Sequence, residues 1–155
     1  MKKLITVIYT IFLAIAFQSN AQEVEYSFAV VGCNRVDKGD TNSVTNPSTA
    51  NIYQLNRIFS EVMLLKPQPK FLFLAGDIVF GYTADSMQLE RQLTAWKNLY
   101  LAHPIAASAI KLVLIPGNHE TPNDKKVAIA SAERTWIRIM APYINGSNGP
   151  KPGQI

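Results

Sequence analysis

The order of short apolar runs and longer segments of helical periodicity constrains the fold more than any other feature of the sequence. The apolar runs are rich in Val, Ile, Leu and Phe and are predicted to be strands; they lie at residues 23–31, 71–75 and 112–115. The run at 71–75 has no polar alternation, which is typical of a strand buried on both faces. Strands separated by helices form right-handed βαβ units. The predicted fold class is therefore α/β with a parallel sheet.

The segments between and after these strands are predicted to be helices with one apolar stripe each. The first is expected to start near Asn46-Pro47-Ser48 and to end at Lys66-Pro67, where the proline stops it. The second covers residues 85–101, and the third covers residues 126–140. We interpret His103, just after the second helix, as a polar helix end rather than as a metal ligand.

Residues 1–21 have the pattern of a secretory signal peptide. Lys2 and Lys3 precede an apolar stretch at residues 4–17, and Ser19-Asn20-Ala21 offers small residues before a cut ahead of Gln22. The stretch is too short for a comfortable membrane span, and the alternative is an uncleaved N-terminal anchor. We therefore expect an exported protein, periplasmic or secreted, with no stable membrane span after cleavage.

The charge balance argues against nucleic acid as a partner. The full sequence has a formal net charge of +4, and removal of the leader takes away two of its lysines. The remaining Lys and Arg residues are spread along the chain and form no basic stripe with interleaved aromatics. The single cysteine, Cys33, cannot form an internal disulfide, so stability has to come from an ordinary hydrophobic core.

Side chains that bind metals or transfer protons follow each predicted strand, directly after a glycine. The three runs are Gly32-Cys33-Asn34-Arg35, Gly76-Asp77 and Gly117-Asn118-His119-Glu120. Ligands of open α/β sheets gather at the carboxyl ends of the strands, so these loops are expected to line one site. A carboxylate, an amide oxygen and an imidazole suit a hard or borderline divalent metal that acts on phosphate esters.

Two of these runs also have a plainer interpretation. Asp77 alone is compatible with a cap of the segment that follows it. Residues 117–120 alone are compatible with a turn built on Pro-Gly-Asn that carries an incidental histidine. The occurrence of both runs at separate strand ends favours the functional interpretation.

At these residues the chain resembles the calcineurin-like metallophosphoesterases. Gly76-Asp77 and Gly117-Asn118-His119-Glu120, each after an apolar strand, are similar to the second and third motifs of that family. The run Gly-Asp-Ile-Val-Phe-Gly-Tyr at residues 76–82 is especially similar to the purple-acid-phosphatase-like branch, and Asn148-Gly149-Pro150 resembles the substrate-side loop of that branch. The resemblance covers residues 26–150.

The resemblance implies a two-metal hydrolase of phosphomonoesters or phosphodiesters, built on a four-layer α/β sandwich. By similarity, Asp77 would bridge both divalent metals, Asn118 would ligate the second, and His119 would act catalytically beside the substrate. The metals would be zinc, manganese or iron. The family draws further histidines from C-terminal motifs, and no histidine follows His119. Residues 22–155 are therefore expected to be the N-terminal part of such a domain and to be inactive alone.

The first motif departs from the family pattern. The family has an Asp and a His, two residues apart, where this chain has Cys33 and Arg35. Arg35 has no lone pair for a metal, so we expect it to bind a phosphate oxygen of the substrate. Cys33 is compatible with a thiolate ligand, which favours zinc, and equally with a small buried hydrophobic residue.

These substitutions support an alternative function. In it, a catalytically impaired phosphoesterase-like module binds phosphorylated ligands through Arg35 and His119. A third and weaker alternative is a structural protein of the envelope whose polar strand ends are incidental.

Overall fold

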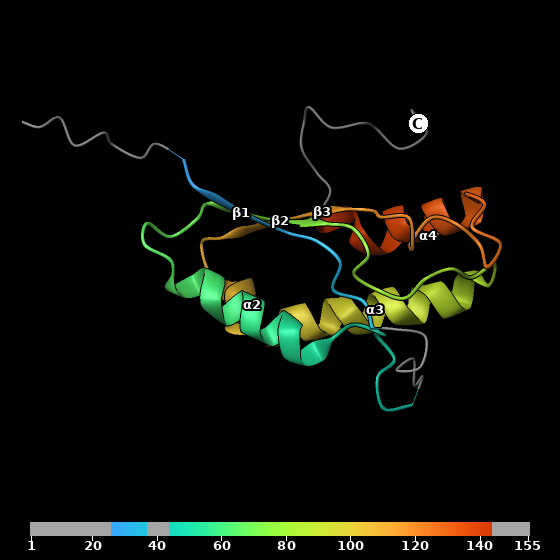
Figure 1. Ribbon diagram of the computed structural model, residues 1–155, viewed down its shortest axis with the longest axis horizontal. Coiled ribbons are helices and arrows are strands. Elements are labelled where there is room, and N and C mark those ends of the chain that lie inside the picture. The colour runs from blue at the N-terminus through green and yellow to red at the C-terminus, as the bar shows by residue number, and fades with distance from the viewer. Residues whose placement is uncertain (1–25, 37–43, 144–155) are drawn as a thin grey trace, which may run out of the picture.

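The computed structural model describes residues 26–36 and 44–143 (Figure 1). Within them, three strands form one parallel sheet in the order β1-β2-β3. The strands are β1 (Phe28–Val31), β2 (Phe71–Ala75) and β3 (Lys111–Ile115). Their register places Phe73 of β2 opposite Val30 of β1 on one side and Val113 of β3 on the other. The prediction of a parallel α/β fold is confirmed.

The helices that connect the strands cover one face of this sheet. α2 (Ile52–Leu64) joins β1 to β2, and α3 (Ser86–Ala102) joins β2 to β3. Figure 1 shows both helices on the same side, as expected when consecutive strands are neighbours and both crossovers have the same hand. α4 (Ala130–Met140) follows β3 and packs against α3. Two 3-10 helices, η2 (Pro104–Ala107) and η3 (Ala141–Tyr143), follow α3 and α4.

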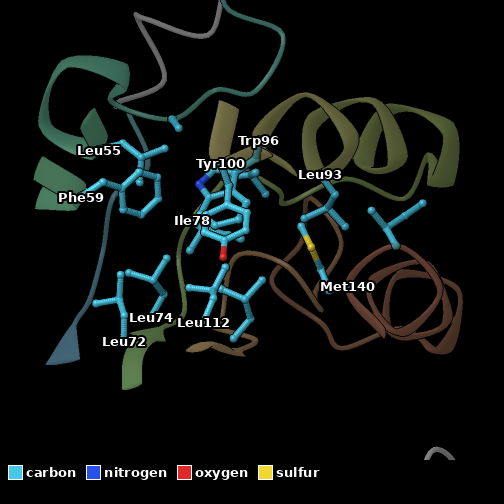
Figure 2. Close-up of a cluster of buried hydrophobic side chains, with 14 of the residues drawn as sticks. Leu55, Phe59, Leu72, Leu74, Ile78, Leu93, Trp96, Tyr100, Leu112 and Met140 are labelled. Atoms are coloured by element: carbon cyan, nitrogen blue, oxygen red, sulfur yellow. The ribbon is translucent and has the colours of Figure 1, made fainter. Parts of the chain in front are cut away.

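The hydrophobic core lies between the sheet and these helices (Figure 2). Alternate residues of the strands point into it, and the apolar stripes of the helices close it from the other side. Phe59 is fully buried and meets two rings of α3 edge-on, with centroid distances of 6.5 Å to Trp96 and 5.8 Å to Tyr100. The labelled core residues are Leu55, Phe59, Leu72, Leu74, Ile78, Leu93, Trp96, Tyr100, Leu112 and Met140.

The opposite face of the sheet is not covered by any described element. Phe28 is 64% exposed and Val30 is 59% exposed, while Phe73 is half-buried. The prediction that residues 71–75 are buried on both faces is therefore wrong for the described part of the chain. An unbroken apolar run reports that both faces are hydrophobic, but it cannot report what packs against them.

The first predicted helix begins later than expected. Asn46 accepts the backbone N–H of Thr49 through its own carbonyl oxygen, and its side-chain amide donates to the carbonyl oxygen of Ala50 at 2.9 Å. Thr49 has a φ of 52°, which is incompatible with a right-handed helix. Asn51 is instead the N-cap of α2, and its side chain accepts the N–H of Gln54 at 3.1 Å.

The last predicted helix is also shorter than expected at its start. Residues 126–129 do not belong to α4, because Lys126 has a φ of 61° and Ala128 pairs with Pro122 in an isolated antiparallel bridge. Val127, an apolar residue within the predicted range, is 58% exposed. The periodicity of the segment is real only from Ala130 onward.

Several predictions concern residues that the structure does not describe. They include the signal peptide at residues 1–21 and the loop resembling a substrate-side loop at Asn148-Gly149-Pro150. Among the helices of residues 26–36 and 44–143, none combines the length and the apolar character needed to cross a bilayer.

Candidate metal centre

Asp77 lies where the loops after β1 and β2 meet. Its backbone carbonyl oxygen accepts the N–H groups of Asn34, at 2.9 Å, and of Arg35, at 2.8 Å. The N–H of Cys33 donates to the neighbouring carbonyl oxygen of Gly76 at 3.2 Å. These main-chain bonds continue the parallel pairing of β1 and β2 beyond the strands. They hold the two predicted loops side by side at the carboxyl edge of the sheet.

The Asp77 carboxylate touches all three predicted loops. Its Oδ2 lies 3.7 Å from the thiol of Cys33 and 3.8 Å from Nε of Arg35. Its Oδ1 accepts the backbone N–H of His119 at 3.3 Å. The sequence predicted that these loops line one site, and the structure brings the residues together. Their roles as ligands or catalysts stay predictions.

Glu120 ties the loop after β3 to the loop after β2. Its side chain is fully buried, and its two oxygens accept four backbone N–H groups. Oε1 takes those of Ile78 at 2.7 Å and Val79 at 3.2 Å, and Oε2 takes those of Gly117 at 2.7 Å and Asp77 at 3.0 Å. Burial raises the pKa of Glu120, and hydrogen bonds from these backbone groups act in the opposite direction. The buried carboxylate thus links the backbone after β2 to the backbone after β3 through hydrogen bonds.

His119 is buried beside two aromatic residues of the loop after β2. Its ring centroid lies 3.8 Å from that of Tyr82 and 5.8 Å from that of Phe80. Nδ1 makes a short hydrogen bond with the backbone carbonyl of Phe80. A carbonyl oxygen can only accept, so Nδ1 carries a proton, and in the neutral ring Nε2 keeps the lone pair. Nε2 is therefore the atom of this ring that is available for proton transfer.

Asn118 is exposed, and its side-chain amide nitrogen donates to the hydroxyl of Tyr82. The amide oxygen is the other end of the same group, and it is the end that can bind a cation. The backbone of Tyr82 also takes part, since its N–H donates to the carbonyl oxygen of His119 at 2.9 Å. Residues 80–82 therefore contact both predicted residues of the Gly-Asn-His-Glu run.

Close backbone approach at the site depends on glycine. Gly81 has a φ of +57°, and a Cβ built on it would lie 1.8 Å from the carbonyl oxygen of His119. Gly76 has a φ of +81°, and a Cβ there would lie 2.4 Å from the Cα of Gly117. L-residues with a side chain rarely adopt this backbone conformation. Gly76 and Gly81 are thus required by the close packing between the loops.

Comparison with known proteins assigns the chain to a family. The family model for calcineurin-like phosphoesterases matches residues 28–151, a range that contains all three loops. The chain belongs to this family. No curated protein and no solved structure matches the chain at a significant level. At the level of the family, this is a domain of metal-dependent phosphoester hydrolases.

The residues at the strand ends fit the divalent metal of a calcineurin-like phosphoesterase only in part. Within residues 26–36 and 44–143, no group of three His, Cys, Asp or Glu side chains is arranged to hold a metal ion. The Asp77 carboxylate and the Asn118 amide oxygen are donors of the kind that a divalent cation takes. Beside Oδ2 of Asp77, the guanidinium of Arg35 offers no lone pair and repels a cation. The donors present therefore fit a cation toward Asn118 better than one toward Arg35.

Two residues of this calcineurin-like site, Glu120 and Tyr82, have roles that the sequence did not predict. Glu120 stands in the run at residues 117–120 and Tyr82 in the run at residues 76–82, but their types and positions there predict no role for them. Glu120 acts on N–H groups up to 43 positions away, and Tyr82 acts on a residue 36 positions away. No local pattern in the sequence links such partners.

Proposed function

We propose that the protein is a metal-dependent hydrolase of phosphate esters, either phosphomonoesters or phosphodiesters. The observation that carries the proposal is the position of Asp77. Its carboxylate reaches the thiol of Cys33, the guanidinium of Arg35 and the backbone of His119, from loops that follow three different strands. A carboxylate beside a cationic side chain, on loops that also carry Asn118 and the His119 imidazole, suits phosphoryl transfer.

Each residue has a role in this proposal. Asp77 and Asn118 would hold a divalent cation, which would supply Lewis-acid activation of the phosphoryl group and of the attacking water. Arg35 binds a non-bridging phosphate oxygen; its Nε is buried and has no hydrogen-bond partner among the described residues. His119 would donate the Nε2 proton of its doubly protonated ring to the leaving oxygen and return to the neutral form, while the Phe80 carbonyl holds the Nδ1 proton. A positioned acid of this kind contributes about 10²–10⁴-fold in rate.

The finer assignments are also part of the proposal. The run at residues 76–82 supports membership of the purple-acid-phosphatase-like branch, and the leader pattern at residues 1–21 supports export. A thiolate ligand at Cys33 would favour zinc over manganese or iron. Export is tested by mass spectrometry of the mature protein, which should begin at Gln22.

Metal content is the decisive experiment. Elemental analysis of the full-length protein after reconstitution with zinc, manganese and iron should find bound divalent metal, and Asp77→Asn should lower its amount. Asp85→Asn is the matched control, since Asp85 is an exposed helix cap and asparagine caps equally well. A wild-type protein that retains none of the three metals would sink the proposal.

The substitutions at Cys33 and Arg35 favour one second function, a phosphoesterase-like module that binds phosphorylated ligands without turning them over. Both functions include a phosphate contact at Arg35, so binding of inorganic phosphate does not separate them. Turnover does. A metal-loaded protein that hydrolyses no member of a panel of aryl phosphates, yet binds phosphate, would support the binding module.

A further inference from the structure

We infer that Tyr82 is a positioning residue that turns the carbonyl oxygen of Asn118 toward the metal. The inference rests on the proposed function, because it assigns Asn118 as a ligand. It adds a residue that contacts neither metal nor substrate and acts through its hydrogen bond to Asn118.

The side-chain amide of Asn118 has two unlike ends on one axis. The oxygen can bind a cation, whereas the NH₂ group is a donor and repels one. A half-turn about the last side-chain bond exchanges the two ends at little steric cost. Asn118 is exposed, so burial does not select either orientation. A ligand of this kind needs a partner for its nitrogen.

Tyr82 supplies that partner, since its hydroxyl oxygen accepts the amide nitrogen of Asn118. The Tyr82 hydroxyl is itself held in place. The backbone N–H of Tyr82 donates to the carbonyl oxygen of His119 at 2.9 Å. The centroid of the Tyr82 ring lies 3.8 Å from that of the His119 ring and 6.4 Å from that of the Phe80 ring, which meets it edge-on. The hydroxyl therefore presents a fixed acceptor, and the amide oxygen of Asn118 is left for the cation.

Removal of the hydroxyl alone should weaken metal binding without disturbing the ring contacts. Residues that orient a metal ligand typically contribute about 10–100-fold in metal affinity. Asn118 can still turn its oxygen to the metal by chance in the Tyr82→Phe variant, so we expect a loss near the low end of that range, about 10-fold.

The test titrates Mn²⁺ alone into the metal-free, full-length protein by calorimetry. Tyr82→Phe should raise the Kd for Mn²⁺ about 10-fold. Tyr53→Phe is the matched control, because Tyr53 is 74% exposed on α2, and it should leave the Kd unchanged.

A second background separates positioning from a general effect on the fold. In Asn118→Asp, both side-chain oxygens can bind the metal, so orientation no longer matters. Tyr82→Phe should then change the Kd for Mn²⁺ by less than about 2-fold, a rescue that a merely structural role of Tyr82 would not produce.

The outcomes distinguish the inference from the function on which it rests. If the wild type and Tyr82→Phe bind Mn²⁺ equally, the inference fails while the proposed function stands. Tighter binding by Tyr82→Phe would also overturn it, since the hydroxyl would then be donating to the ligand oxygen. An equal loss in the Asn118→Asp background would show that Tyr82 acts through the fold. A wild type that binds neither Mn²⁺ nor Zn²⁺ overturns both.

Discussion

Oε1 of Glu120 accepts the backbone N–H of Ile78 at 2.7 Å, so a side chain that follows β3 holds the main chain that follows β2. The same carboxylate accepts three further N–H groups. The two loops that carry Asp77 and His119 are therefore joined by a buried group as well as by the sheet. The geometry of the site depends on a residue that need not touch metal or substrate.

Replacement of Glu120 by glutamine should destabilise the protein strongly. The amide oxygen can replace one carboxylate oxygen, but the NH₂ group then faces two backbone donors and leaves them unsatisfied in the interior. Buried unsatisfied groups cost about 1–3 kcal/mol each, so we expect the free energy of unfolding in urea to fall by about 2–4 kcal/mol. Glu61→Gln, on the exposed face of α2, is the control and should leave the unfolding midpoint near that of the wild type. Equal unfolding midpoints for both variants would show that the hydrogen bonds of Glu120 to the two loops do not stabilise the protein.

Alanine at Gly81 should damage both stability and activity. The added Cβ would meet the carbonyl oxygen of His119, and the left-handed backbone itself costs an L-residue about 1–2 kcal/mol. We expect a lower melting temperature and a lower kcat, because the histidine has to move. Gly32→Ala is the matched control, since its nearest neighbour would be the carbonyl oxygen of Ala75 at 3.8 Å. Wild-type kcat in Gly81→Ala would show that the contact with His119 is dispensable.

Truncation of Phe59 should be among the most costly changes in the core. The side chain is fully buried and packs on Trp96 and Tyr100, so alanine would leave a cavity under the sheet. Such substitutions cost about 3–5 kcal/mol of unfolding free energy, measurable by urea denaturation. Tyr53→Ala on the same helix should change it by no more than about 0.5 kcal/mol, because that ring lies in solvent. A loss below about 1 kcal/mol for Phe59→Ala would contradict this prediction and would mean that the core collapses around the gap.

His103 should make the protein less stable in mild acid. Burial lowers the pKa of His103, whose neutral Nδ1 accepts the N–H of Ile105 at 3.2 Å at the start of η2. The unfolded chain takes up a proton near the ordinary pKa of about 6.5, whereas the folded chain does so only at lower pH. Stability from this group is therefore fully present above the pKa of the unfolded chain, and it is lost as the pH falls from there through the lower pKa of the folded chain.

The check compares unfolding free energies at pH 7.5 and pH 5.5 for the wild type and His103→Asn. Asparagine offers an uncharged acceptor at the same helix start, so the drop between the two pH values should be smaller in the variant. Identical drops would assign the acid sensitivity to other groups.

Cys33→Asp tests the first motif. The Cys33 thiol now lies 3.7 Å from Oδ2 of Asp77. An aspartate at this position would add a hard oxygen donor next to the Asp77 carboxylate. We expect the preference of the protein to shift from Zn²⁺ toward Mn²⁺, as measured by competitive metal binding. Cys33→Ser supplies the control for size without a strong ligand. Metal content and activity that do not change in Cys33→Asp would remove Cys33 from the set of ligands.

Local patterns in the sequence predicted much of this architecture. The bounds of β2 at Phe71–Ala75 were predicted to the residue, and α3 begins one residue after the predicted start at Asp85, which is its N-cap. Hydrophobic periodicity and capping residues act over a few positions, so they can be recognised in the sequence without knowledge of the fold. The same holds for the placement of Asp77 and His119 at strand ends, since parallel strands bring their carboxyl ends to one edge.

Only the tertiary structure decided how the strand ends become one site. The late starts of α2 and α4 follow from bridges between Arg35 and Ala50 and between Pro122 and Ala128, which local propensity does not encode. The hydrogen bond between Tyr82 and Asn118 joins positions 36 residues apart. The buried carboxylate of Glu120 and the N–H of Ile78 are 42 residues apart. By itself the sequence determined which side chains stand at the edge of the sheet. Packing between loops determined which atoms of those side chains are held and which are left for chemistry.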